Sequence, residues 1–399
     1  MKAGLLNIDK SNWVLTTLGD IAKEISKRVD NPSASDYEKF VGLEHIVSGD
    51  LKIRKWGTTE NLTSSGKAFD AGDILLARRN TYLRRASLVS FDGVCSGDAF
   101  VLRENHEKVV PGFLTFVVNS NALWDYANAN AAGTMSKRVR WIDLANYEFL
   151  LPPKKQQSEI TELLWAMDMV VEKNHSLLVK SDVLKESLFL NTLFEKSDEI
   201  DANFGQRKSK YPIKKLGDLI SKLQYGISES LSHDAGIPIL RMNNLQEGKL
   251  VLGDLKYFDF PEEEFSKYKL DRGDVLFNRT NSFDLVGKVS LFDVDGDYSF
   301  ASYLLRIKVV SELLDPRFLN VYLNSSLGMA KIRKYRTPGV SQSNINAENL
   351  KRVPVPAPSI GFQQNLMDKI ATLDHAALSL SEEINFSKTL QKTLINQVF

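Results

Sequence analysis

The sequence predicts a duplicated chain of the mixed α/β (α+β) class, in which two pseudo-symmetric domains are separated by two long helices that form an antiparallel coiled coil. Three observations support this prediction. The chain repeats a series of segments in the same order, each series ends in a long stretch without glycine or proline, and 399 residues exceed what one ordinary core holds.

The repeat covers nearly the whole chain. Four blocks of the first half recur in the second half: "WVLTTLGDIAKEI" at 13–25 as "YPIKKLGDLISKL" at 211–223, "GDILLARRN" at 72–80 as "GDVLFNRTN" at 273–281, "PGFLTFVVNS" at 111–120 as "PRFLNVYLNS" at 316–325, and "LLPPKKQQSEI" at 150–160 as "PVPAPSIGFQQNLMDKI" at 354–370. Four matches in one order indicate a tandem duplication, with small loop insertions between the blocks.

The segments that close the two copies, within 154–204 and 362–399, lack glycine and proline and carry apolar residues at alternating spacings of three and four. This spacing is typical of a heptad stripe. One such stripe is usually a surface helix packed on its own domain. Two helices of about 38 residues, roughly 57 Å each, exceed a small domain, so we expect them to pair. The predicted interface residues are Ile160, Leu163, Met167, Val170, Leu177, Leu184 and Leu188 in the first helix and Ile370, Leu373, Ala377, Leu380, Ile384 and Leu394 in the second.

Four polar residues also fall on these stripes, namely Asn174, Ser181, Ser387 and Gln391. They would weaken the pair and help to fix its register. An antiparallel pair would return Phe399 to the first domain. The predicted boundaries are a first domain at 1–155, a first helix at 156–196, a linker at 197–210, a second domain at 211–361 and a second helix at 362–399.

Within each domain, short apolar runs bounded by glycine and aspartate predict strands. The runs after Gly72-Asp73 and Gly273-Asp274 are expected to enter the core. Basic and amide side chains follow them, and further basic clusters lie downstream in both copies. A single basic run is usually a solvated face. Arginine can grip a phosphate or a guanine edge, and asparagine or glutamine can do the same for adenine, so clusters in both copies favour nucleic-acid binding. The candidate DNA-binding residues are Arg78, Arg79, Asn80, Tyr82, Arg84, Arg85, Lys137, Arg138, Arg140, Arg279, Asn281, Arg333, Lys334, Arg336, Gln342 and Asn344.

The composition argues against several other classes. Cys95 is the single cysteine and the five histidines are scattered, so we expect no disulfide, no metal site and no cofactor. The Gly-Lys pairs lack the Ser or Thr of a phosphate-binding loop, and the one Pro-Pro pair does not fit an adenine methyltransferase loop. We therefore expect no catalytic residues. A nuclease site built from the plentiful carboxylates stays an alternative. No stretch predicts a signal peptide or a membrane span, so a cytoplasmic location is expected.

The repeated blocks resemble the specificity (S) subunits of type I restriction-modification systems. The resemblance rests on the two "LGD" segments, the "GDILL" blocks, and the glutamine pairs Gln156-Gln157 and Gln363-Gln364 after proline turns. It implies a non-catalytic subunit with two target-recognition domains, each of which binds half of an asymmetric bipartite DNA site. It also implies helices that set the spacer between the half-sites. The implied partners are double-stranded DNA, two methyltransferase subunits and, through these, restriction/translocase subunits.

The two copies differ in one family feature. The family often has a glycine-rich segment that ends in glutamine, as in "TPGVSQSNI" of the second copy, whereas the first copy has "AAGTMSKRV" with Lys137 near that place. Two alternatives stay open. A related bipartite system could use such a subunit with a fused nuclease-methyltransferase, and outside DNA binding the chain could be a coiled-coil adaptor between proteins.

Overall fold

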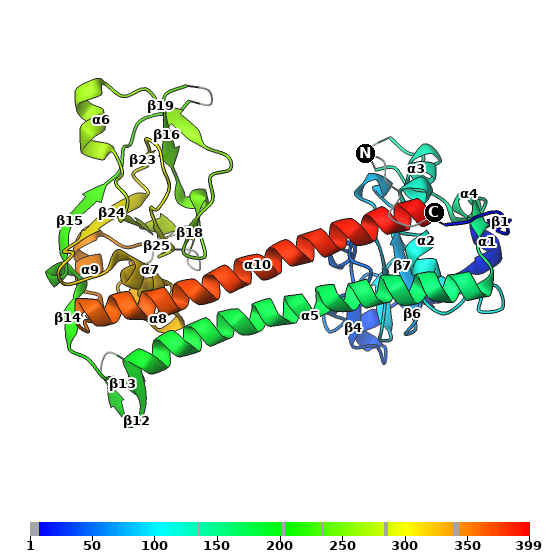
Figure 1. Cartoon of the computed structure of the whole chain (residues 1–399), viewed down its shortest axis with the longest axis horizontal. Coiled ribbons are helices and arrows are strands. Elements are labelled where there is room, and N and C mark those ends of the chain that lie inside the picture. Colours follow the sequence, from blue (N-terminus) through cyan, green and yellow to red (C-terminus); the bar gives the residue numbers. More distant parts are fainter. Residues whose placement is uncertain (1–7, 135, 202–203, 233–234, 283–285, 338–342) are drawn as a thin grey trace. The chain divides into compact units, whose positions relative to one another are not determined.

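The structure is a computed structural model that describes residues 8–134, 136–201, 204–232, 235–282, 286–337 and 343–399. The chain divides into two compact units, Met1–Leu178 with Leu378–Phe399 and Val179–Ala377. Each unit therefore contains one domain together with one part of each long helix, α5 (Lys154–Leu193) and α10 (Ile360–Val398) (Figure 1).

The first unit is built around an antiparallel four-stranded sheet with the order β2-β10-β7-β8. A second sheet has the order β3-β6-β9-β4-β5, with β4 parallel to β9, and β1 pairs with β11. The strands are β1 (Val14–Thr17), β2 (Ala22–Ile25), β3 (Arg28–Val29), β4 (Lys39–Val41), β5 (Gly57–Thr58), β6 (Gly66–Phe69), β7 (Ile74–Ala77), β8 (Ala86–Leu88), β9 (Gly93–Ser96), β10 (Ala99–Glu104) and β11 (Glu148–Leu151). The short helices are α1 (Leu18–Ile21), α2 (Leu114–Val117), α3 (Asn121–Ala129) and α4 (Trp141–Leu144).

The second unit repeats this plan. Its main sheet has the order β15-β24-β20-β22, β16 is parallel to β23, and β14 pairs with β26. The strands of the second domain are β14 (Ile213–Lys215), β15 (Ile220–Tyr225), β16 (Ile237–Leu240), β17 (Leu245–Gln246), β18 (Lys249–Leu250), β19 (Lys256–Phe258), β20 (Val275–Asn278), β21 (Thr280–Asn281), β22 (Val289–Leu291), β23 (Ser299–Phe300), β24 (Leu304–Val309), β25 (Ser343–Asn344) and β26 (Pro354–Pro356). The helices are α6 (Glu262–Tyr268), α7 (Pro316–Asn324), α8 (Ser326–Lys334) and α9 (Ala347–Lys351).

The glycine-aspartate pairs form the turns that lead into the central strands β7 and β20, as expected. Gly72 and Gly273 have φ values of +94° and +95°, a conformation that favours glycine. Asp73 is buried and accepts hydrogen bonds from Arg103 Nε at 2.7 Å and from the Asp70 amide at 2.9 Å. Asp274 is equally buried and accepts from the Asp271 amide at 2.9 Å. The four residues of each strand are buried, so this part of the repeat is scaffold.

The long helices α5 (green) and α10 (red) pair in antiparallel fashion in each unit (Figure 1). In the first unit, Gln391 Nε2 donates to the Leu164 carbonyl at 2.9 Å, and Asn174 Nδ2 donates to Glu383 at 3.2 Å. In the second unit, Lys185 forms an ion pair with Asp374 at 2.8 Å. Residues later in α5 therefore pair with residues earlier in α10, as in an antiparallel helix pair. The predicted fold class, two mixed α/β domains with an antiparallel helix pair, is confirmed.

Burial agrees with the predicted contact stripe on α10 but not on much of α5. Ile370, Ile384 and Leu394 of α10 are buried, and its other predicted contact residues are partly buried. On α5, by contrast, four predicted contact residues are exposed, at 42, 49, 40 and 55% for Leu163, Val170, Leu177 and Leu184. Ile160, Met167 and Leu188 are partly buried.

The buried line of α5 lies one residue further along the chain and passes through Gln157, Thr161, Leu164, Asp168, Val171 and Asn174. Most of these buried residues are polar. The spacing of apolar residues therefore indicated the adjacent line of the helix.

The predicted linker contains an antiparallel hairpin, β12 (Phe194–Asp201) with β13 (Gly205–Ser209), so α5 ends three residues before the predicted boundary. The Phe194 and Phe204 rings are tilted by 56° to each other with centroids 4.9 Å apart, and they join the core of the second unit. The expected return of the C-terminus is confirmed. The Phe399 ring lies 5.3 Å from Phe113, and Lys10 Nζ donates to the Val398 carbonyl at 2.6 Å.

Candidate nucleic-acid interface

The ends of β7 and β20 hold two arginines in equivalent backbone positions. The Arg78 amide donates to the Asp98 carbonyl and the Arg279 amide to the Tyr303 carbonyl, both at 3.0 Å. The Arg78 guanidinium lies 5.5 Å from the Phe100 ring centre and that of Arg279 lies 5.0 Å from Tyr225. Both side chains are half-buried, and neither has an ion-pair partner within the described residues. Each strand is thus followed by an arginine that has no counter-ion among the residues that the structure describes.

In the first domain, two basic segments that lie far apart in the sequence meet at this strand end. The Val139 amide donates to the Arg78 carbonyl and the Asn80 amide to the Lys137 carbonyl, both at 3.0 Å. Asn80 has a φ of +54°, which turns the chain sharply after the strand. The structure therefore brings together Arg78, Arg79, Asn80, Lys137 and Arg138 from the predicted set.

Asp98 is the charged centre of this cluster. Its carboxylate accepts from Arg138 Nε at 2.8 Å and from Arg138 Nη2 at 3.2 Å, and it lies 3.5 Å from Arg79 Nη1. Arg79 Nε also donates to the Ser136 hydroxyl at 2.5 Å. The hydrogen bonds from Arg138 lower the pKa of Asp98, which stays ionised at neutral pH.

Other predicted residues of the first domain are engaged elsewhere. Arg84 donates to Asn121 and, at 2.8 Å, to Asp125, both on α3. Arg85 donates to the Leu43 carbonyl at 2.7 Å, and burial lowers the pKa of its guanidinium. Arg140 forms an ion pair with Asp143 at 2.7 Å near the start of α4. Tyr82 is 68% exposed. The run of four arginines therefore divides: two lie at the strand end, Arg84 binds α3 and Arg85 binds the Leu43 carbonyl.

In the second domain the equivalent cluster is built from neutral groups. Thr280 pairs with Asn344 and Asn281 with Ser343, through β21 and β25. The Ile345 amide donates to the Arg279 carbonyl at 2.9 Å, as Val139 does to Arg78. Arg333 and Lys334 are exposed at the end of α8 and Arg336 is partly buried. The Thr337 amide donates to the Asn344 carbonyl at 2.8 Å, which joins their segment to the cluster, while Gln342 lies outside the described residues.

Sequence reasoning missed three residues at these strand ends, Asp98, Tyr225 and Tyr303. Asp98 and Tyr303 occupy equivalent positions, because each carbonyl accepts from the arginine that ends the central strand. Tyr225 and Tyr303 are 42 and 49% exposed. The alignment of "SGDAFVLR" with "SYLLRIK" contained a signal, since it places an aspartate of one copy opposite a tyrosine of the other.

The glutamine of each proline turn fixes a long helix to its domain. Gln157 accepts from the Val110 amide at 3.0 Å and donates to the Lys108 and Pro152 carbonyls at 3.2 and 2.9 Å. Gln363 accepts from the Asp315 amide at 2.9 Å and donates to the Leu313 and Pro358 carbonyls at 2.9 Å each. Gln157 and Gln363 are thus equivalent, and both stabilise the scaffold.

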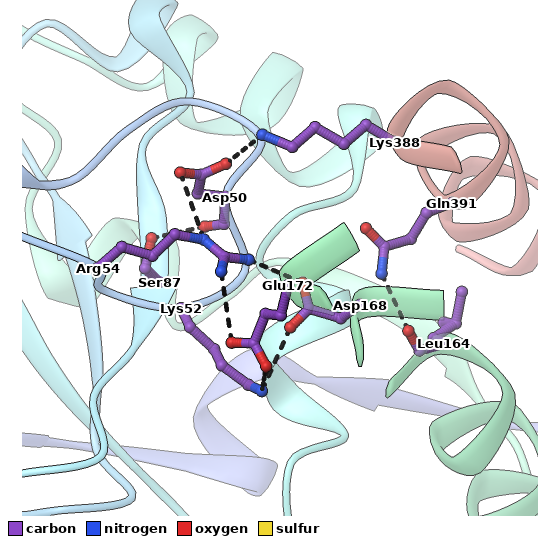
Figure 2. A network of polar contacts seen from close by, with 9 residues as sticks. All are labelled: Asp50, Lys52, Arg54, Ser87, Leu164, Asp168, Glu172, Lys388 and Gln391. Atoms are coloured by element: carbon purple, nitrogen blue, oxygen red, sulfur yellow. Dashed lines mark hydrogen bonds and ion pairs between the residues drawn. The ribbon is translucent and has the colours of Figure 1, made fainter. Parts of the chain in front are cut away.

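A second attachment links both helices to the loop around residues 50–54 of the first domain, as Figure 2 shows. Arg54 lies 3.5 Å from Asp168 and 3.4 Å from Glu172 on α5. Lys388 of α10 lies 2.6 Å from Asp50. Burial raises the pKa of Asp168, although Lys52 and Arg54 oppose part of that shift. This network makes the first domain and the adjoining parts of both helices one packed unit.

Two further findings concern the described part of the chain. No helix there is long and apolar enough to cross a membrane. No group of three or more His, Cys, Asp or Glu side chains there could hold a metal ion.

Comparisons with known proteins agree on one family. The model of the "Type I restriction modification DNA specificity domain" matches residues 208–386. The putative type I restriction enzyme MjaX specificity subunit of Methanocaldococcus jannaschii is 25% identical over 199 residues, which are 49% of this chain and 47% of that protein. The type I restriction enzyme EcoKI specificity subunit of Escherichia coli K12 is 21% identical over 405 residues, covering 96% of this chain and 86% of that protein.

A solved structure has the same fold. The type I restriction-modification system S subunit from M. genitalium has a TM-score of 0.54 and 14% identity, and the match covers 100% of this chain and 98% of that one. The match to this solved structure extends over both domains and both long helices described above. Residues 208–386 thus match the model of the type I restriction modification DNA specificity domain, and nearly the whole chain is similar to a type I restriction enzyme specificity subunit.

Proposed function

We propose that the chain recognises an asymmetric bipartite DNA sequence, and that each domain binds one half of it. The observation that carries the proposal is that both domains present the same strand end with different side chains. Arg79, Asp98 and Arg138 of the first domain correspond to Thr280, Tyr303 and Asn344 of the second. Charged and amide groups at one backbone position suit different base edges.

The comparison of the two domains also suggests which basic residues contact phosphate and which contact bases. Arg78 and Arg279 are equivalent and chemically identical, so they suit the phosphate backbone, which is the same in every sequence. Residues that differ between the copies suit the bases. Lys137, which is exposed, and Arg333 and Lys334 at the end of α8 would add phosphate contacts.

The long helices would set the spacer between the half-sites and bind the methyltransferase. In the first unit, Leu163, Val170 and Leu177 form an exposed apolar line on α5 at seven-residue spacing. Such a line on a helix is a docking surface for a partner. The proposed partners are two methyltransferase subunits, with restriction/translocase subunits bound through them. The chain itself would be non-catalytic.

Exchange of residues 13–150 for those of a homologue tests this function. The hybrid, reconstituted with the methyltransferase, should methylate a site with one half changed and the other half retained. Methylated adenines are mapped on genomic DNA. A hybrid that changes both halves, or neither, contradicts the proposal.

The alternatives predict other results. A coiled-coil adaptor would not lose DNA affinity steeply as salt rises, whereas a protein with several phosphate contacts would. Methyl transfer or cleavage by the purified chain alone would contradict a non-catalytic role. A partner that carries nuclease and methyltransferase in one polypeptide would favour the related bipartite system.

A further inference from the structure

Arg138 and Asp98 form a fork that leaves one edge of the guanidinium open. Nε and Nη2 of Arg138 are the two donors to the Asp98 carboxylate. Nη1 has no hydrogen-bond partner within the described residues, and the side chain is 41% exposed. Because a guanidinium has five N–H groups, the Nη1–Nη2 edge still offers two parallel donors.

The backbone on both sides of this pair is fixed by hydrogen bonds. Arg138 exchanges two of them with Ala132, at 2.9 and 3.0 Å, and Val139 beside it is fully buried. The Asp98 carbonyl accepts from the Arg78 amide at the end of β7. Both side chains therefore project from a rigid strand end, and the ion pair removes much of the rotamer freedom of a long side chain. A donor pair held in this way is preorganised for a planar acceptor.

We propose that Arg138 recognises a guanine in the major groove of the first half-site, and that Asp98 is the positioning residue that orients it. Guanine offers two acceptors, O6 and N7, that match the free edge of the guanidinium. A phosphate can also accept from two donors of one guanidinium, but such a contact would give no preference for a base. The inference rests on the proposed function and deepens it, because it assigns one base and two residues to the first domain.

The same kind of fork also occurs in Arg140 on Asp143 and in Arg103 on Asp73, and the second of these serves the scaffold. Arg103 makes a similar fork on Asp73 and also contacts Asp70 at 2.6 Å, but it lies towards the far end of β10 from Asp98. Asp73 is buried in the turn that starts β7, so that pair serves the scaffold. In the second domain, Tyr303 and Asn344 replace the pair, so we expect no equivalent guanine contact there.

The test selects duplexes from a random-sequence library with the complex of the full chain and its methyltransferase, and then measures affinities on the selected site. The variants are Arg138→Ala, Arg138→Lys and Asp98→Asn, with Asp70→Asn as the matched control. The wild-type site is also made with 7-deazaguanine, which lacks N7. Thermal unfolding and the preference at the second half-site show whether each variant is folded.

We expect one guanine of the first half-site to lose its preference in Arg138→Ala, with affinity lower by roughly 5- to 150-fold. Arg138→Lys should not restore the preference, since lysine lacks the planar fork. Asp98→Asn should weaken the same position by less, about three- to tenfold. In 7-deazaguanine duplexes the wild type should fall towards the affinity of Arg138→Ala. Asp70→Asn and the second half-site should not change.

Three results would overturn the inference. If Arg138→Ala weakens all sequences equally and keeps the selected motif, Arg138 contacts phosphate, and the proposed function survives while this inference fails. If Asp98→Asn behaves as the wild type while Arg138→Ala relaxes the base, Asp98 is not a positioning residue. If the wild-type complex selects no bipartite motif at all, the proposed function fails as well.

Discussion

The strand ends of the two domains share their backbone hydrogen bonds but carry different side chains, charged in the first domain and uncharged in the second. In the first domain, Asp98 gathers Arg138 and Arg79 into an ionic cluster. In the second, Tyr303, Thr280 and Asn344 occupy the same positions and carry no charge. The hydrogen bonds that join the segments, from Val139 to Arg78 and from Ile345 to Arg279, are preserved.

This difference separates what duplication kept from what it changed. The turns at Gly72 and Gly273, the buried strands β7 and β20, and the glutamines at the helix starts are equivalent in both domains. All of these groups are buried or have a backbone conformation that favours glycine, so a change would cost stability. Some residues just beyond the strands face fewer packing constraints, and these have diverged: Arg79, Asp98 and Arg138 correspond to Thr280, Tyr303 and Asn344.

The first prediction tests whether the paired helices α5 and α10 form the framework that both domains share. Four residues inserted in α5 between Leu178 and Val179 advance the helix by about 6 Å and rotate it by roughly 40°. The contacts of Leu164 with Gln391 and of Lys185 with Asp374 could then not both persist. We expect loss of cooperative unfolding and of methyltransferase binding, measured by thermal unfolding and co-purification.

A matched insertion in α10 between Ala377 and Leu378 is the control. It should restore both properties and lengthen the spacer of the methylated site by one or two base pairs. If the single insertion in α5 leaves unfolding and spacer unchanged, the paired helices are not the framework.

The second prediction tests whether the scaffold is equivalent in the two domains. Gln157→Leu and Gln363→Leu should each destabilise the chain by about 2–4 kcal/mol, because each leaves a buried N–H and two carbonyls without partners. Gln364→Leu, at an exposed neighbouring position, should change the free energy of unfolding by less than about 0.5 kcal/mol. Urea unfolding measures all three. Unequal effects of the first two would mean that the domains have diverged in their cores as well.

The third prediction concerns the two equivalent arginines. Arg78→Ala and Arg279→Ala should each weaken binding to all sequences about equally and lower the salt slope of the binding constant by about one unit. Arg272→Ala, at the other end of β20, should leave the slope unchanged. The measurement is a salt titration of duplex binding by fluorescence anisotropy. A change of base preference in either variant would assign that arginine to the bases.

Periodicity and repeats predicted most of the fold. Particular residues show which parts these patterns could not predict. The duplication, the buried central strands and the α10 stripe follow from local pattern, which depends on each segment's own burial. The α5 stripe was misplaced by one residue, because Gln157, Thr161, Asp168 and Asn174 are buried polar residues. Their hydrogen bonds and ion pairs come from other segments, such as Arg54 for Asp168, and no local pattern reports them.

The candidate site was predicted in part for the same reason. Arg79 and Arg138 were singled out because basic runs are visible in sequence, but Arg84 belongs to the same run and binds α3. Asp98 escaped notice because an acidic residue is not expected in a DNA-binding cluster. Its role depends on a tertiary contact with Arg138, which is 40 residues away in the chain.

The last prediction, with the smallest expected effect, concerns the final residue of the central strands, where Ala77 corresponds to Asn278. Asn278 is fully buried, and neither its amide nitrogen nor its amide oxygen has a hydrogen-bond partner within the described residues. A buried polar group without a partner costs stability, so Asn278→Ala should stabilise the chain by about 0.5–1 kcal/mol after the loss of packing. The reverse change, Ala77→Asn, should destabilise it by about 1–3 kcal/mol, since it places an amide in the equivalent buried site. Urea unfolding with an unchanged m-value measures both.

If Asn278→Ala instead destabilises the chain by more than about 1 kcal/mol, a water or another polar group satisfies the amide. The second domain would then need this asparagine to hold Arg279 and Thr280 in place, and the divergence between the domains would begin inside the strand and not beyond it.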